Sequence, residues 1–277
     1  MLLKVSKSKL RAESEIEIPG SKSHTIRALF ISSLAQGQSK IIRPLISGDA
    51  LSAVETCKKL GAGIYEEDKN YIVEGFGKKP SIPDDVIEVG NSGTTLRFGV
   101  AAAALAEGYT IFTGDRQIRS RPMDPLIKAL NNLGAEVIST RNNGRAPVIV
   151  KGVMKGGMTE LDAYSSQYLS ALLITCPLLE HDTEIILTRL NEKPYVEMTL
   201  WWLDKQDIKY SNNDFKSIYI KGGQEYRPLE TVIPGDFSSA TFFMVLAAIS
   251  GQRITLRNLD MTDPQGDKLV LTYLENM

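Results

Sequence analysis

Apolar and polar positions follow the same order four times along this chain. Each time, a short alternating stretch typical of a strand ends in a hydroxyl-rich turn, and the turn opens an apolar helix. The turns contain Ser23, Thr94, Ser166 and Ser239, which are separated by 71, 72 and 73 residues. This regular spacing indicates an internal repeat in which each unit is one structural motif.

The same pattern predicts the elements of each unit. Strands leading into the turns are expected at residues 15–18, 86–89, 158–161 and 231–233, followed by helices near residues 27–30, 96–105, 169–173 and 240–249. A second strand and a second, amphipathic helix come next. Two more strands are then expected around the turn residues Asp68-Lys69-Asn70, Asn143-Gly144 and Asn212-Asn213-Asp214. The predicted fold is therefore α/β, built from repeated βαβαββ units.

The repeat also predicts how the chain divides into domains. Residues 17–230 contain three complete units and are expected to form one domain. Residues 1–16 and 231–277 are expected to begin a second domain. The fourth unit reaches only its second helix at Met277, so we expect the chain to be part of a longer protein; the alternative is a natural C-terminal helix.

Composition and charge exclude several classes of partner. The 277 residues are 43% hydrophobic and 23% charged, and the net charge of −1 provides no general attraction for nucleic acid or membranes. The first 20 residues contain no apolar run resembling a signal peptide, and the longest apolar stretch, near residues 242–249, is far shorter than the roughly 20 residues of a membrane span. We expect a cytoplasmic protein with no nucleic-acid or membrane partner.

Cysteine and histidine positions argue against metal chemistry. Cys57 and Cys176 lie far apart and are expected to be free, buried thiols. The two histidines, His24 and His181, do not have metal-ligand spacing. The turn at residues 20–23 resembles a phosphate loop only superficially, because the upstream glycine of that motif is missing. The sequence therefore supports neither a metal site nor ATP binding.

Several helix starts carry cations where structural caps favour acids. Lys22 lies in the first helical turn, Arg27 follows Ser23 by four residues on the same side, and Arg97 comes just after Thr94. A cation near a helix N-terminus costs about 0.3–1 kcal/mol unless an anion is bound there as well. One serine pair or one arginine alone is more often a cap or a solvated side chain. Repeated in register, the set predicts a site for a multiply anionic small molecule.

At these residues the chain resembles the enolpyruvyl transferase family. The matching stretches occur in family order along the whole sequence: Pro19-Gly20-Ser21-Lys22-Ser23 with Arg27, residues 90–97, Thr113-Gly114-Asp115 with Arg121-Pro122-Met123, residues 165–172, Lys193-Pro194-Tyr195 and Gln265-Gly266-Asp267. The loop with Arg121 also contains Arg116 and Arg119, and a planar guanidinium can bind a carboxylate or phosphate with two hydrogen bonds.

The resemblance implies a fold and a reaction. The fold is an inside-out α/β arrangement of two domains, each with three βαβαββ units, so the second domain is incomplete in this chain. The reaction is transfer of the enolpyruvyl group of phosphoenolpyruvate to the 5-hydroxyl of shikimate 3-phosphate, with release of phosphate, in the shikimate pathway to chorismate and aromatic amino acids. Both substrates are anionic, no cofactor is required, and the full-length protein is expected to be a monomer.

The resemblance also implies roles for individual residues. Lys22 is expected to contact both substrates and to stabilise charge in the transition state, and Arg121 shares the catalytic assignment. Phosphoenolpyruvate is expected to contact Lys22, Gly93, Arg121 and Gln167. Shikimate 3-phosphate is expected to contact Lys22, Ser23, Arg27, Ser165, Ser166, Gln167 and Tyr195.

Two departures from the family pattern affect these expectations. Glu192 stands where the family usually has a serine that touches the substrate phosphate, so its carboxylate is expected to point away, to pair with a cation or to alter affinity. The family's catalytic aspartate and glutamate belong to repeats that follow Met277. We therefore expect the 277 residues alone to have no appreciable transferase activity and only weak binding of shikimate 3-phosphate.

Three alternatives remain from the sequence. The first is the related enolpyruvyl transferase that acts on UDP-N-acetylglucosamine, although its usual reactive loop cysteine has no counterpart in residues 115–121. The second is a non-catalytic ligand-binding remnant, which retention of Lys22, Arg27 and Gln167 argues against. The third is a purely structural repeat protein, which does not need cations in the first turns of its helices.

Overall fold

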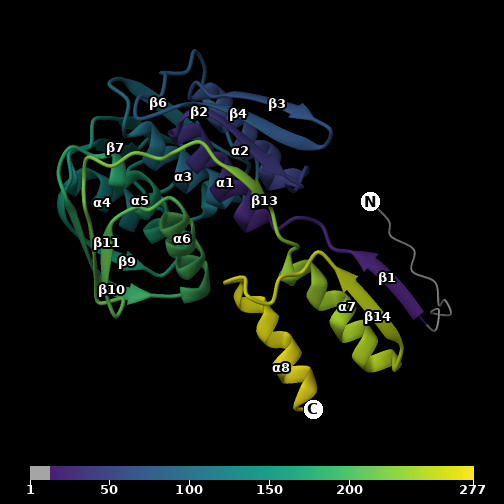
Figure 1. Ribbon diagram of the computed structural model, residues 1–277. Helices are drawn as coiled ribbons and strands as arrows, with labels where there is room; N and C mark the ends of the chain where they lie inside the picture. The colour runs from purple at the N-terminus through teal and green to yellow at the C-terminus, as the bar shows by residue number, and fades with distance from the viewer. Residues whose placement is uncertain (1–12) are drawn as a thin grey trace.

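The computed structural model describes residues 13–277, which form a larger and a smaller body (Figure 1). The larger body contains the first three units apart from the first strand, and the smaller body contains that strand together with the last helices. Both described ends of the chain lie on the smaller body (Figure 1). Residues 1–12, which belong to the predicted second domain, lie outside the described residues.

The βαβαββ order is observed in the first three units. The first unit comprises β1 (Glu13–Glu17), α1 (Lys22–Leu34), β2 (Gln36–Ile42), α2 (Gly48–Lys59), β3 (Gly63–Glu67) and β4 (Asn70–Phe76). The second comprises β5 (Ile87–Glu88), α3 (Gly93–Ala103), β6 (Tyr109–Thr113), the 3-10 turn η1 (Ile118–Ser120), α4 (Asp124–Asn132), β7 (Glu136–Ser139) and β8 (Val148–Lys151).

The later units follow the same order. The third comprises β9 (Gly157–Ala163), α5 (Ser166–Thr175), η2 (Cys176–Leu178), β10 (Thr183–Leu190), α6 (Lys193–Lys205), β11 (Tyr210–Asn213) and β12 (Ser217–Ile220). The fourth comprises β13 (Glu230–Val232), α7 (Phe237–Ser250), β14 (Arg253–Arg257), η3 (Gly266–Lys268) and α8 (Leu269–Glu275). The three predicted hairpins are confirmed, because β3–β4, β7–β8 and β11–β12 pair antiparallel.

Strand pairing shows an exchange that the repeat pattern did not predict. In the second and third units the first strand pairs in parallel with the second, as β5–β6 and β9–β10. In the first unit β1 instead pairs with β14 of the smaller body, and β13 takes its place beside β2. The domain division at residue 230 stays a prediction, and β13, which straddles it, belongs to a sheet of the larger body.

Helices form the centre of the larger body and the sheets lie outside them (Figure 1). Helices α1, α3 and α5 are almost entirely buried, which explains why they lack a polar face. The strands present alternate residues to these helices, so each sheet has a buried and an exposed face. The predicted α/β fold of βαβαββ units, with its helices inside, is confirmed.

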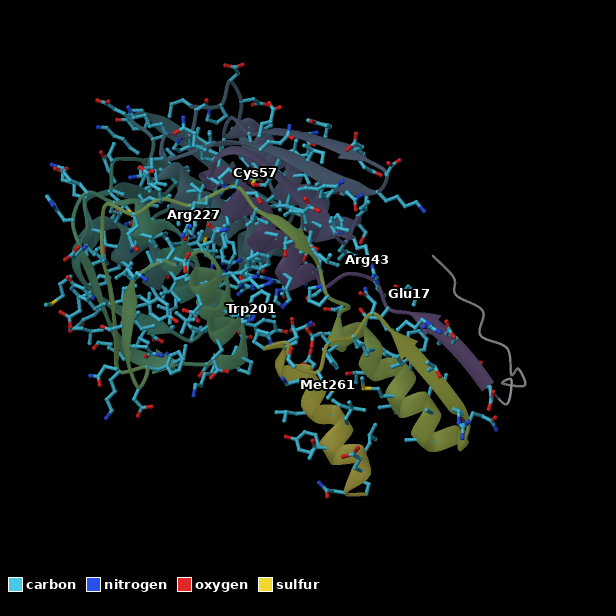
Figure 2. All side chains as sticks on the ribbon, viewed as in Figure 1. Glu17, Arg43, Cys57, Trp201, Arg227 and Met261 are labelled. Carbon is cyan, nitrogen blue, oxygen red and sulfur yellow. The ribbon has the colours of Figure 1, made fainter. Side chains whose placement is uncertain are left out.

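Two antiparallel segments, residues 18–21 and 233–236, connect the bodies. Ser21 N–H donates to the Pro234 carbonyl (2.8 Å) and Asp236 N–H donates to the Pro19 carbonyl (2.9 Å). Gly20 is required here, because a Cβ would lie 2.4 Å from the Arg43 carbonyl oxygen. Beside this crossing, Arg43 forms an ion pair with Glu17 at the end of β1 (Figure 2).

A buried hydrogen-bond chain joins the bodies a second time. Trp202 Nε1–H of α6 donates to His24 Nδ1 of α1 (3.0 Å), and His24 Nε2 lies 3.0 Å from Asp263 Oδ2 of the smaller body. An indole N–H can only donate, so Nδ1 carries no proton and a neutral His24 donates from Nε2 to Asp263. Trp201, labelled in Figure 2, packs edge-on against the same imidazole at 5.3 Å between ring centroids.

The smaller body has a small core and an exposed apolar helix. Its buried cluster is Ile18, Phe237, Ala240 and Met244. The side chains of Phe242 and Ile249 on α7 are each 77% exposed. Apolar side chains gathered on one surface are typical of an interface. Among the helices of residues 13–277, none combines the length and the apolar character that crossing a bilayer requires.

The His24 chain predicts that stability depends on pH. Burial lowers the pKa of His24 from its ordinary value of 6.5, although Asp263 opposes the shift. The unfolded chain therefore binds a proton more readily, so the stability contributed by neutral His24 is complete above about pH 6.5 and is lost as the pH falls through the lower folded pKa. Urea midpoints followed by far-ultraviolet circular dichroism from about pH 7.5 to about pH 5.5 measure this loss.

The variant Trp202→Phe separates this contribution from other titrations. Removing the indole N–H allows His24 Nδ1 to bind a proton, so the pH dependence over this range is expected to shrink even though the protein is less stable at every pH. Trp201→Phe is the matched control, and it is expected to keep the wild-type dependence. Equal pH dependence in wild type and Trp202→Phe contradicts the role given to His24.

Candidate functional site

A cavity of about 390 Å³ lies where several helices begin, at the junction of the two bodies. All four repeat markers, Ser23, Thr94, Ser166 and Ser239, line it. The repeat therefore brings the starts of α1, α3, α5 and α7 to one place. The other lining residues are Lys22, Arg27, Leu45, Gln167, Glu192, Tyr195, Asp236 and Ser238.

The helix starts present the positive ends of their dipoles to this cavity. Their first turns contain no acidic residue that would compensate this charge. The caps differ between helices. Ser92 accepts a hydrogen bond from Thr95 N–H at α3, and Asp236 accepts one from Ser239 N–H at α7. Ser21 and Ser165, the caps of α1 and α5, make no such side-chain bond. The starts of α1 and α5 are thus the ones not satisfied by their own caps.

Lys22 stands at the edge of the cavity with its side chain 49% exposed. Its Nζ lies 3.2 Å from Asp49 Oδ2, in the first turn of α2. A partly exposed ion pair of this kind contributes about 0–1 kcal/mol. The ammonium group can therefore exchange this partner for an anionic ligand at little cost.

Arg27 is a buried cation, only 3% exposed. It donates to Thr199 Oγ1 (2.8 Å), the Tyr195 carbonyl (2.8 Å), the Ser23 carbonyl (3.0 Å) and Ser170 Oγ (3.2 Å). Within residues 13–277 it has no carboxylate partner. Burial lowers its pKa to about 9, so it remains charged at neutral pH. Arg27 fixes a positive charge at the cavity wall without a compensating anion from the described chain.

A second cationic corner surrounds Gly93. A Cβ at this position would lie 2.8 Å from Arg97 Nη1, 2.9 Å from Arg121 Nη1 and 3.4 Å from Gln167 Oε1. Arg97 is buried and donates to the Gly93 and Pro122 carbonyls, and burial lowers its pKa. Gln167 lines the cavity, so this corner adjoins it. The missing side chain at Gly93 leaves room where two guanidinium groups approach each other.

At the start of α5 the carboxylate of Glu192 contacts Ser166. Ser166 N–H (3.2 Å) and Ser166 Oγ (2.8 Å) both donate to Glu192 Oε2. Glu192 neither points away nor, within the described residues, pairs with a cation, so those two expectations were wrong. Ser165, in contrast, occupies the N-cap position of α5 without a side-chain capping bond and is not among the residues that line the cavity.

The predicted residues are thus largely brought together. Lys22, Ser23, Arg27, Ser166, Gln167 and Tyr195 line one cavity, and Gly93 and Arg121 adjoin it through Gln167. Arg116 and Arg119 are exposed and do not line it. The roles that the sequence predicts for the cavity residues in binding and catalysis remain predictions, because proximity alone does not test them.

The sequence did not predict three residues that line the cavity or support its wall: Asp236, Thr199 and Ser170. Asp236 could have been found, because an acid three residues before Ser239 is a common N-cap pattern. Thr199 and Ser170, which hold Arg27, gave no signal, because they lie 172 and 143 residues from it in sequence. Within residues 13–277, no group of three or more His, Cys, Asp or Glu side chains is placed to hold a metal ion.

A larger hollow, of about 540 Å³, lies on α4 and β9. Three carboxylates line it, those of Asp124, Glu160 and Asp162, and Lys128 is its single lysine. This charge is unfavourable for an anion. The smaller cavity is therefore the better candidate for the site that the cations predict.

Comparison with known proteins identifies the family of this chain. The family model described as EPSP synthase (3-phosphoshikimate 1-carboxyvinyltransferase) matches residues 7–277. Proteins named 3-phosphoshikimate 1-carboxyvinyltransferase from Acetivibrio thermocellus and Ruminiclostridium cellulolyticum are 68% and 57% identical over 277 residues. Each alignment covers 100% of this chain and 65% of the relative, so the chain spans 65% of the length of these relatives.

The fold comparison gives the same result. A solved structure of EPSP synthase from Acinetobacter baumannii is similar with a TM-score of 0.83 and 25% sequence identity. The match covers 96% of this chain and 59% of that chain. The similarity therefore extends over nearly all of the present fold.

The buried position of Arg27 predicts a large cost for a conservative change. In Arg27→Lys one ammonium group replaces the planar fork, leaving several of the buried acceptors around it unpaired. The free energy of unfolding is expected to fall by about 2–4 kcal/mol. The control is Arg43→Lys, whose side chain is 46% exposed and is expected to change stability by less than about 0.5 kcal/mol. Similar losses in the two variants, measured by urea unfolding, rule out this account of Arg27.

Proposed function

The chain belongs to the EPSP synthase family, and on that basis we propose that its cavity binds the substrates of the family reaction. In that reaction the enolpyruvyl group of phosphoenolpyruvate is transferred to the 5-hydroxyl of shikimate 3-phosphate, and phosphate is released. The chain spans 65% of the length of its curated relatives, so the transferase activity is proposed for the whole protein. For these 277 residues the proposal is binding of shikimate 3-phosphate and of part of phosphoenolpyruvate.

One observation carries the proposal: Arg27 is buried at the cavity wall without a carboxylate partner among the described residues, beside helix starts that favour anions. A buried cation is costly unless it is compensated. Shikimate 3-phosphate and phosphoenolpyruvate each bring a phosphate and a carboxylate. Substrates with these charges fit a cavity built in this way.

For the acceptor substrate we propose Lys22, Ser23, Arg27, Ser165, Ser166, Gln167 and Tyr195. Arg27 uses four of its five N–H groups on the protein, and the remaining one is on Nη1. Ser166 directs both its N–H and its hydroxyl toward an anionic group, at present the Glu192 carboxylate. These donors are of the kind that phosphate and carboxylate oxygens accept from.

For the donor substrate we propose Lys22, Gly93, Arg121 and Gln167. Arg121 is exposed and its Nη1 approaches the space beside Gly93, where a two-pronged hydrogen bond to a carboxylate or phosphate is possible. Lys22, at the edge of the same cavity, stands beside the acceptor residue Ser23 in sequence. A cation placed between the two substrates can interact with both.

The proposed chemistry requires positioning and electrostatics rather than a covalent intermediate on the protein. A proton adds to the methylene carbon of phosphoenolpyruvate while the 5-hydroxyl oxygen attacks the neighbouring carbon and gives up its own proton. In the tetrahedral intermediate the bond between that carbon and the phosphate ester oxygen then breaks. Phosphate leaves with this oxygen, and the enolpyruvyl double bond re-forms with loss of a methyl proton. Lys22 and Arg121 stabilise the negative charge on the phosphate.

We further propose that residues 17–230 act as one domain and that the acceptor binds at its junction with the next domain. In support, the hydrophobic core of the larger body is continuous and begins at Ile26, although it extends to Ile233, just past the proposed boundary. We also propose that the full-length protein is cytoplasmic and monomeric. The names of the relatives described above give no support to UDP-N-acetylglucosamine as the acceptor.

Calorimetric titration of the purified chain with shikimate 3-phosphate tests the proposal. We expect saturable binding that a large excess of UDP-N-acetylglucosamine does not displace. Lys22→Met is expected to weaken binding about 10-fold or more, because one charge-assisted hydrogen bond is lost.

Lys58→Met is the matched control, since Lys58 is a similarly exposed lysine whose one ion-pair partner in residues 13–277 is Glu55 on α2. It is expected to bind shikimate 3-phosphate with wild-type affinity. A folded wild-type protein that shows no heat of binding refutes the proposed function. Equal weakening by both substitutions refutes the role of Lys22.

A further inference from the structure

Glu192 brings a carboxylate into the cavity at the start of α5. Its Oε2 accepts both hydrogen bonds that Ser166 can donate, from the backbone N–H at 3.2 Å and from Oγ at 2.8 Å. Ser166 is almost wholly buried, and Glu192 lines the same cavity as Lys22 and Arg27. The chain therefore supplies its own anion to a helix start that its cap residue leaves unsatisfied.

The backbone at Glu192 directs this carboxylate away from its own helix. Glu192 is the N-cap of α6 and adopts a left-handed conformation (φ 55°, ψ 41°), which is uncommon for a residue other than glycine. Its side chain makes no capping bond to α6. Among the described residues, Ser166 is the one hydrogen-bond partner of this carboxylate, so breaking the contact requires a change at a single side chain.

Under the proposed function, the phosphate of the acceptor uses the Ser166 donors that the Glu192 carboxylate now occupies. A phosphate monoester carries about −1.5 to −2 charges at neutral pH and three acceptor oxygens. A phosphate and a carboxylate sharing the two Ser166 donors are like charges in contact, which is unfavourable. A phosphate can therefore reach Ser166 only when the Glu192 carboxylate has left it.

We propose that Glu192 is a specificity-determining residue: its carboxylate occupies the phosphate-binding donors of Ser166 and must be displaced when a phosphorylated acceptor binds. This inference rests on the proposed function, because it concerns the acceptor part of the same cavity. Glu192 lowers the affinity for the phosphorylated acceptor, since displacement costs two charge-assisted hydrogen bonds. It has little effect on the same ring without phosphate, which does not need these donors.

The test compares shikimate 3-phosphate with unphosphorylated shikimate by calorimetry. Glu192→Gln keeps the size of the side chain and an oxygen acceptor for Ser166 but removes the charge. It is expected to bind shikimate 3-phosphate about tenfold more tightly, equivalent to 1.4 kcal/mol, while its affinity for shikimate changes less than about twofold. Glu192→Ser removes the competing carboxylate altogether. It is expected to give the same result as Glu192→Gln: tighter binding of shikimate 3-phosphate and little change for shikimate.

Glu197→Gln is the matched control. It removes the same charge from the same helix, where Glu197 pairs with Lys193 (3.5 Å), and Glu197 does not line the cavity. Wild-type affinity is expected for this variant. A gain as large as that of Glu192→Gln means that only net charge matters, and it overturns the inference.

The remaining outcomes separate this inference from the proposed function. If wild type binds shikimate 3-phosphate and both Glu192 variants, shown to be folded, bind it no more tightly, then Glu192 is only a structural cap and the inference is wrong. A lower urea midpoint without a gain in affinity leads to the same conclusion. If neither the folded wild type nor any variant binds shikimate 3-phosphate, the proposed function fails and the inference fails with it.

Discussion

The structure depends on three buried helices that pack against one another and begin at one cavity. Phe30 of α1 contacts Phe98 of α3 edge-on, at 5.5 Å between ring centroids. Arg97 of α3 lies over the ring of Tyr168 in α5 at 5.9 Å, and Arg27 of α1 donates to Ser170 of α5. Because each pair of helices is connected, their positive ends are held together by the core rather than by surface loops.

This packing explains why cations lie where dipoles oppose them. Arg27 and Arg97 are each only 3% exposed. Carbonyl and hydroxyl oxygens accept from four N–H groups of Arg27. Two carbonyls accept from Arg97, whose buried Nε has no partner among the described residues. Such partners solvate a guanidinium but do not neutralise it, so positive potential remains at the cavity. We infer that the protein keeps this potential for anionic substrates. Glu192, held by Ser166, supplies part of the negative charge from within the chain.

The sequence predicted local structure better than long-range pairing. The repeat, the hairpin turns and the hydroxyl-rich helix starts were readable, because each depends on neighbouring residues. The exchange of β1 and β13 could not be predicted, because the sequence of a strand does not specify which sheet edge it pairs with. Family resemblance predicted Arg27 as a site residue, but its support by Thr199 depends on tertiary packing. Glu192 departs from the family pattern in the sequence, but its contact with Ser166 depends on how α5 and α6 pack together.

A crystal structure of the chain with shikimate 3-phosphate tests the central claim most directly, which is that helix starts from separate repeats form one anion site. The account predicts the substrate phosphate within hydrogen-bond distance of Ser166 N and Oγ, the substrate in contact with Lys22 and Arg27, and the Glu192 carboxylate displaced. Substrate bound away from these helix starts, or phosphate bound elsewhere while Glu192 still accepts from Ser166, contradicts the account.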